Sequence, residues 1–193
     1  GSATGGKGGD IQVSVGTGSV GEGGHIQVAS GSSAASSGGS ISLSAGYSTP
    51  TSSGSVVVRT SNAGTAGISG ALIFVSGTTS NGASGKLSLA SGAATNGHSG
   101  DIKLRVGTSK TAFGGNVIVD AGDSEPLTGG AVSLDTGSGV ATSSGQIVLK
   151  SKDAGTAGTS GVLSFRTGTT SSGTSGFIAV STGTATGGKG GDI

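Results

Sequence analysis

Gly9-Asp10-Ile11-Gln12-Val13-Ser14-Val15-Gly16 is the stretch on which the prediction of the fold depends. Glycine opens and closes it, and aliphatic residues alternate with free positions in between, which is typical of a short strand with one buried face. The pattern returns along the whole chain at intervals of 15 residues, with two intervals of 16. The leading aliphatic residue falls at Ile11, Ile26, Ile41, Val56, Leu72, Leu87, Ile102, Val117, Val132, Ile147, Leu163, Ile178 and Ile193.

Three further positions of the repeat are restricted in residue type. An invariant glycine stands two residues before each leading aliphatic residue, which suggests a positive φ or a close backbone approach. A second apolar residue stands two positions after it, from Val13 to Val180, and a third inward position, from Val15 to Thr182, is small or β-branched. The positions between them vary freely, as expected of side chains that point outward.

The segment between successive strands also holds one position that is always small. Its members are Ala3, Gly18, Ser33, Ser48, Ala63, Thr79, Ala94, Ser109, Ser124, Gly139, Ala154, Thr170 and Ala185. We interpret this small row as an inner wall that lies opposite the aliphatic rows. The sequence therefore predicts an all-β fold, a parallel β-solenoid (β-helix or β-roll) with about one 15–16-residue coil per repeat and a core shared between neighbouring coils.

An arrangement with two repeats in each coil stays open. In the outward row Arg105, Asp120, Asp135, Lys150 and Arg166, one repeat per coil stacks two aspartates, whereas two repeats per coil make the charges alternate. The small row favours one repeat per coil.

A longer period is superimposed on the short one. Residues 63–67 recur at 154–158, and both 16-residue intervals obey the same offset of 91, so six coils form a super-repeat. We expect residues 1–193 to be one continuous array, with super-repeats 1–91 and 92–182 and residues 183–193 starting the next. Residues 1–11 return at 183–193 with one substitution, which predicts that the chain is a segment of a longer array.

Composition excludes several classes of protein. Glycine makes up 44 of 193 residues and cysteine is absent, so neither a disulfide framework nor a zinc–thiolate cluster is possible. A net charge of +1 gives no basic footprint for nucleic acid, and no apolar run is long enough to span a membrane.

The repeat resembles the short β-roll repeats in the heads of trimeric autotransporter adhesins. It is also similar to the Gly/Ser/Thr-rich repeats of large algal and oomycete surface proteins. This resemblance implies an extracellular or cell-surface stalk, fibre or adhesive surface.

Candidate sites are few. Residues 5–10 are similar to a calcium-binding Gly-Gly-x-Gly-x-Asp repeat, but the aspartate returns only at Asp101 and Asp192, so no ladder of oxygen ligands forms. Asp120 and Asp135 fit a surface salt-bridge row better than a cation or proton site. His25 and His98 have no partner at ligand spacing. An ice-binding threonine row, Thr4, Thr95 and Thr186, is interrupted by Ser19, Ala34, Lys110, Glu125 and Val140.

The prediction for function is therefore a structural protein and not an enzyme, with no catalytic, cofactor or metal residues. We expect a rigid extracellular filament, stalk or fibre that self-associates end to end and laterally. An adhesin shaft that contacts glycans or cell surfaces is the alternative, followed by an ice-binding solenoid and a calcium-binding β-roll.

Overall fold

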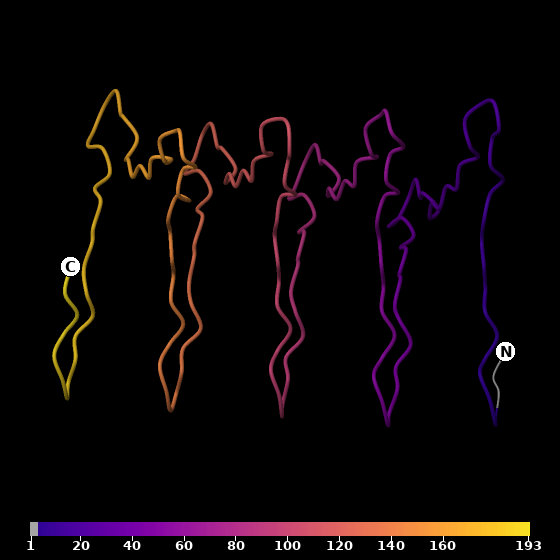
Figure 1. The fold of residues 1–193 in the computed structure, drawn as a ribbon, viewed down its shortest axis with the longest axis horizontal. Helices are drawn as coiled ribbons and strands as arrows, with labels where there is room; N and C mark the ends of the chain where they lie inside the picture. Colours follow the sequence, from indigo (N-terminus) through magenta and orange to yellow (C-terminus); the bar gives the residue numbers. More distant parts are fainter. Residues whose placement is uncertain (1–3) are drawn as a thin grey trace. The chain divides into compact units, whose positions relative to one another are not determined.

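The structure, a computed structural model, describes residues 4–193. Within this range no residue lies in a helix or in a β-strand. The chain runs as extended segments that are joined by narrow loops, and Figure 1 draws it accordingly without coiled ribbons or arrows. Regular structure is therefore limited to what each repeat forms by itself.

Bends mark the loops, and they return in the register of the sequence repeat. Consecutive bends start 15 residues apart, except for steps of 16 from residue 49 to 65 and from residue 140 to 156. The bends comprise residues 4–6, 19–21, 34–36, 49–51, 65–67, 80–82, 95–97, 110–112, 125–127, 140–142, 156–158, 171–173 and 186–188. Each sequence repeat thus contributes one extended segment and one loop.

The small row lies at the start of the bends, so its interpretation as an inner wall is wrong. Ser33 stands directly before the bend at 34–36, and its Oγ accepts the N–H of Ser36 at 3.0 Å. A Cβ built on Gly18 would lie 2.5 Å from the carbonyl oxygen of Gly21. Side chains must be small here because the loop's own backbone passes close by. Ala3 of this row lies outside the described residues.

The invariant glycine faces the third inward residue of the preceding extended segment. A Cβ added to it would meet that residue's side chain at 3.2 Å in Gly24 against Val15, and at 2.9 Å in Gly115 against Val106. The same pairing recurs in every repeat from Gly24 to Gly191. Among the described residues, the glycines with positive φ are Gly67, Gly82, Gly158 and Gly173, which occupy other positions. Close approach therefore favours glycine where the distance is below 3.4 Å, and in the remaining repeats the contact is an ordinary one.

In several repeats a backbone hydrogen bond closes the loop at the same place. The N–H of Gly39 donates to the carbonyl of Gly31 at 2.8 Å, across the bend between them. Further bonds of this kind join Gly24 to Gly16, Gly54 to Gly46, Gly130 to Gly122 and Gly145 to Gly137. We call this closure, together with the contact of the invariant glycine, the neck of the repeat.

The predicted parallel β-solenoid, with about one coil per repeat and six coils per super-repeat, is wrong. Every described residue is exposed except Ser48 and Ala121, which are half-buried. A solenoid needs backbone hydrogen bonds from each repeat to the next and a core between them. Here the neck turns the chain back on itself within one repeat, so the aliphatic rows of residues 4–193 are left uncovered. Neither one nor two repeats per coil describes this arrangement.

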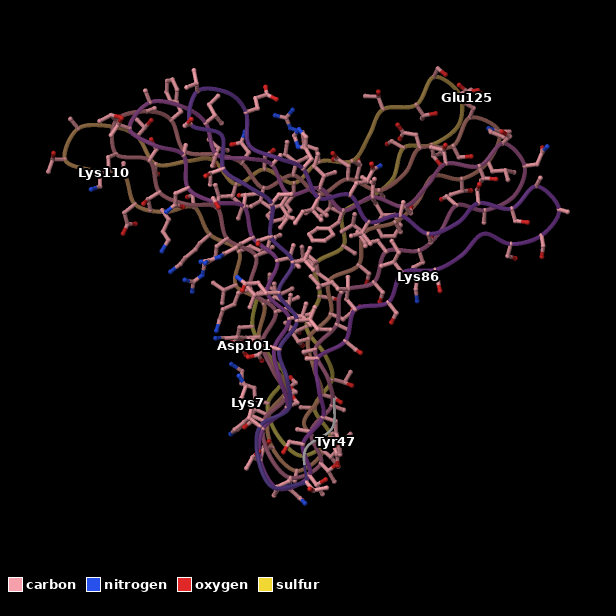
Figure 2. The ribbon with its side chains drawn as sticks, turned by 90° about the vertical axis from the view of Figure 1, so that its right-hand side faces the viewer. Lys7, Tyr47, Lys86, Asp101, Lys110 and Glu125 are labelled. Carbon is pink, nitrogen blue, oxygen red and sulfur yellow. The ribbon has the colours of Figure 1, made fainter. Side chains whose placement is uncertain are left out.

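The chain divides into two units, Gly1–Gly100 and Asp101–Ile193. The division falls near, but not at, the predicted boundary between super-repeats at residue 91. Both units are built from the same repeat. In the first unit, Lys7 and Tyr47 lie in loops that point the same way (Figure 2). In the second unit, Lys110 and Glu125 lie in successive loops that point away from each other.

Candidate functional site

The aliphatic rows form the most extensive chemical feature of each unit. Leading residues in the middle of the chain keep about half of their surface in water: Ile41 is 52% exposed, and Ile147 is 53% exposed. The second row is more open, with Leu43 at 82% and Leu104 at 76%. The aliphatic rows are thus only partly covered, and the predicted core between coils is not formed within residues 4–193.

Four runs of three or more large apolar residues also use the positions that the repeat assigns to the outside. They are residues 56–58, 72–75, 117–119 and 147–149. Their outward members are as exposed as the inward ones, with Val57 and Ile73 at 74% and Ile118 at 76%. Sequence reasoning treated the outward positions as variable and polar and missed these residues. The signal was present, because alternation breaks down wherever three or more aliphatic residues are consecutive.

Two shallow hollows accompany these runs in the first unit. An apolar hollow of about 330 Å³ is lined by Phe74, Leu87, Ser88 and Leu89, which come from two successive repeats. A polar hollow of about 170 Å³ lies at residues 59–62, beside the first 16-residue interval. Only the apolar hollow combines side chains from different repeats.

Ion pairs are local and exposed. Asp10 accepts from Lys7 Nζ at 2.9 Å, Asp101 pairs with Lys103 at 2.6 Å, and Asp192 with Lys189 at 3.0 Å. These are the three aspartates that resemble calcium ligands in sequence, and each has a lysine as its partner. Exposed pairs of this kind stabilise a chain only slightly.

The predicted salt-bridge row is not formed. Among the described residues, no ion pair joins Asp120 or Asp135 to Arg105, Lys150 or Arg166. Asp135 instead accepts a hydrogen bond from Ser133 Oγ at 2.8 Å. Successive loops diverge, so outward residues of neighbouring repeats do not stack as a coil would stack them.

The remaining candidate residues lie in or beside the loops. Thr4, Thr95 and Thr186 each begin a bend, as do Lys110 and Glu125. Since the loops of Lys110 and Glu125 point apart, equivalent positions in the second unit do not line one flat face (Figure 2). His25 and His98 are exposed. Within residues 4–193, no three histidine, aspartate or glutamate side chains gather in a group that could hold a metal ion.

The part of the chain that the structure describes contains no helix of the length and apolarity that crossing a membrane requires. Comparison with protein-family models, with curated proteins and with solved structures found no match to this chain. The resemblance to adhesin heads and to algal and oomycete surface repeats therefore stays a prediction.

Proposed function

We propose that this chain is a structural repeat element of an extracellular fibre or stalk, in which the number of repeats is the property that matters. The observation that carries this proposal is the recurrence of one local geometry. A Cβ built on the invariant glycine would lie 2.9–3.7 Å from the side chain of the third inward residue of the preceding segment in all twelve repeats from Gly24 to Gly191.

A reused unit of this kind supports a structural role because it makes the repeats interchangeable. Catalysis needs a few unlike groups held together at one place. The conformation here is instead set again in every repeat by a glycine contact and a bend, whatever the outward residues are. Adding or removing repeats then changes the length of the element and leaves its local geometry alone.

Composition supports an extracellular setting. Cysteine, methionine and tryptophan, the residues most easily damaged by oxidation, are all absent. Serine, threonine and glycine dominate the loops, and the resemblance to surface repeats points the same way. Secretion of the natural protein is the direct test of this part of the proposal.

The structural role is tested by adding repeats. A chain lengthened by one further copy of residues 92–182 is compared with the natural chain by small-angle X-ray scattering at high dilution. Compact folding would give the natural chain a radius of gyration of about 16 Å, rising only slowly with length. We expect a larger value that rises more steeply with chain length.

Adhesion is the alternative function, and a binding measurement on the same two chains tests it. If the chain binds cells or glycans through a site, the lengthened and natural chains should bind with the same affinity per site, whether or not the chain is compact. Compact scattering together with saturable binding to glycans would overturn the structural proposal.

A further inference from the structure

Residues 71–76, Ala-Leu-Ile-Phe-Val-Ser, contain the longest run of large apolar residues in the chain. Four consecutive apolar residues alternate between the two sides of an extended backbone, and all are exposed: Leu72 at 51%, Ile73 at 74%, Phe74 at 63% and Val75 at 81%. One covering surface on one side could not shield all four. The segment is uncharged and contains no proline, which is the composition that favours pairing between identical strands.

The other three apolar runs each end in a charged residue. Arg59 follows 56–58, Asp120 follows 117–119, and Lys150 follows 147–149. Pairing two copies of such a run in register would place like charges side by side, which is unfavourable. Charges that flank an apolar strand in this way oppose self-association. Residues 71–76 have no such charge. Residues 177–180, Phe-Ile-Ala-Val, also lack one, but there Ala179 stands in the place of Ile73.

The second super-repeat provides an internal comparison. At the offset of 91, residues 162–167 read Val-Leu-Ser-Phe-Arg-Thr, so Ser164 replaces Ile73 and Arg166 replaces Val75. The inward residues are conserved in kind, with Leu163 53% exposed and Phe165 63% exposed. The two segments therefore share the inward side and differ on the outward side.

The chain leaves ample apolar surface on which a partner could bind. It exposes 19100 Å², whereas a folded monomer of 17.6 kDa exposes about 7,900 Å² by the usual scaling. A standard interface covers only about 800 Å² on each partner. A net charge of +1 does not keep copies of the chain apart.

We propose that residues 71–76 bind the same segment of a second copy of this chain, parallel and in register. The two backbones pair through N–H and C=O groups that are otherwise in water, and identical apolar side chains stack. The apolar hollow beside Phe74, lined also by Leu87 and Leu89, gives the partner's aromatic ring a place to pack. This inference rests on the proposed structural function and names its partner.

Sedimentation equilibrium of the full chain tests the proposal with two exchanges between the segments. Ile73→Ser with Val75→Arg gives the first segment the outward residues of the second. Ser164→Ile with Arg166→Val does the reverse. We expect the natural chain to increase in mass with concentration, the first variant to need a roughly hundredfold higher concentration, and the second to associate more readily than the natural chain.

A single spin label locates the contact, since the chain has no cysteine of its own. Labels at Ala71→Cys should show strong dipolar broadening, because in-register pairs bring Cβ atoms to about 5 Å. Val162→Cys, at the equivalent position of the second segment, is the matched control and should show none.

The proposal is overturned if the natural chain stays monomeric at all concentrations. It is also overturned if the exchanges leave the mass unchanged, or if both labels broaden alike. The scattering of the lengthened chain is measured where the chain is monomeric, so the structural function can stand when this inference fails.

Discussion

Eight loops of this chain turn in one of two different ways, although they occupy equivalent positions in the repeat. In the loops of Ser33, Ser48, Ser109 and Ser124, the serine Oγ accepts the N–H of the residue three positions on, at 3.0–3.3 Å. In four others a glycine inside or at the end of the bend adopts a positive φ: Gly67, Gly82, Gly158 and Gly173. The residue at the small position separates the two classes, because alanine or threonine replaces serine in the second.

This difference shows that the repeat determines the position of each turn but not the backbone conformation by which the chain turns. A serine hydroxyl satisfies a backbone N–H that the turn leaves free, so ordinary negative φ angles suffice. In the loops of Ala63, Thr79, Ala154 and Thr170, the chain turns instead through a glycine in a conformation that other residues rarely adopt. In both classes the invariant glycine lies near the third inward residue across the loop, but the backbone hydrogen bond of the neck forms only in the loops of Ser33, Ser48 and Ser124 among these eight.

The largest effect is expected where a loop passes closest to its own backbone. A Cβ at Gly139 would lie 2.5 Å from the carbonyl oxygen of Ser143, so Gly139→Ala must open the turn. The amide of Gly145, which donates to Gly137 at 3.0 Å, should then exchange with solvent about tenfold faster. Gly137→Ala is the control, since nothing lies within 4 Å of its Cβ. Equal exchange in the two variants would contradict a closed loop.

Replacement of a glycine with positive φ should have the next largest effect. Gly82 has φ 117° and Gly173 has φ 101°, with open space around both. Alanine there should cost about 1–3 kcal/mol in the conformation of the turn, through backbone strain alone. The three-bond coupling between the amide and α protons reports φ directly and should show that the turn is lost. Gly97→Ala, in open space without positive φ, should leave the neighbouring couplings unchanged.

Loss of a serine acceptor should have a smaller effect. Ser33→Ala leaves the N–H of Ser36 without its partner at 3.0 Å, at a cost of about 1 kcal/mol, or roughly a fivefold change in turn population. Exchange of the Ser36 amide measures this. Thr79→Ala should change the exchange of its loop less, because Thr79 Oγ1 donates to the Asn81 carbonyl and the turn depends on Gly82. A larger effect at Thr79 than at Ser33 would remove the distinction between the two classes.

The smallest effect is expected at the exposed ion pairs. Lys7 and Asp10 are 80% and 79% exposed and lie outside the bend at 4–6, so solvent screens their attraction. Lys7→Ala should leave amide shifts beyond residues 7–10 unchanged, as should raising the salt concentration. Changes in the amide chemical shifts of Gly16 and of the bend at 19–21 would show that this ion pair contributes to the conformation of the loops.

The register of the molecule could be predicted from sequence because it depends on local constraints. The invariant glycine, the small row and the intervals of 15 and 16 residues locate every neck and every bend, since each reflects steric contact within one repeat. Whether the aliphatic rows are buried could not be predicted. Periodicity tells which side chains share a side of the chain, but Ile41 and Leu104 look the same in sequence whether a neighbouring coil or water covers them.

The self-association segment was missed for a related reason. Averaging over thirteen repeats makes the outward position of Ile73 look polar, because Ser164 and Lys103 occupy equivalent sites in other repeats. The averaged pattern describes the unit that all repeats share. A segment that differs from the others, such as residues 71–76, becomes visible only when single repeats are compared.

Residue-resolved hydrogen exchange on the dilute, monomeric chain tests most directly the claim that each repeat closes on itself. We predict that the amides of Gly39, Gly54, Gly130 and Gly145, which close their necks, are the most protected in their repeats. The amides of the aliphatic segments should exchange at nearly intrinsic rates. Strong protection along the aliphatic segments of successive repeats, as hydrogen bonds from one repeat to the next would produce, would contradict the claim.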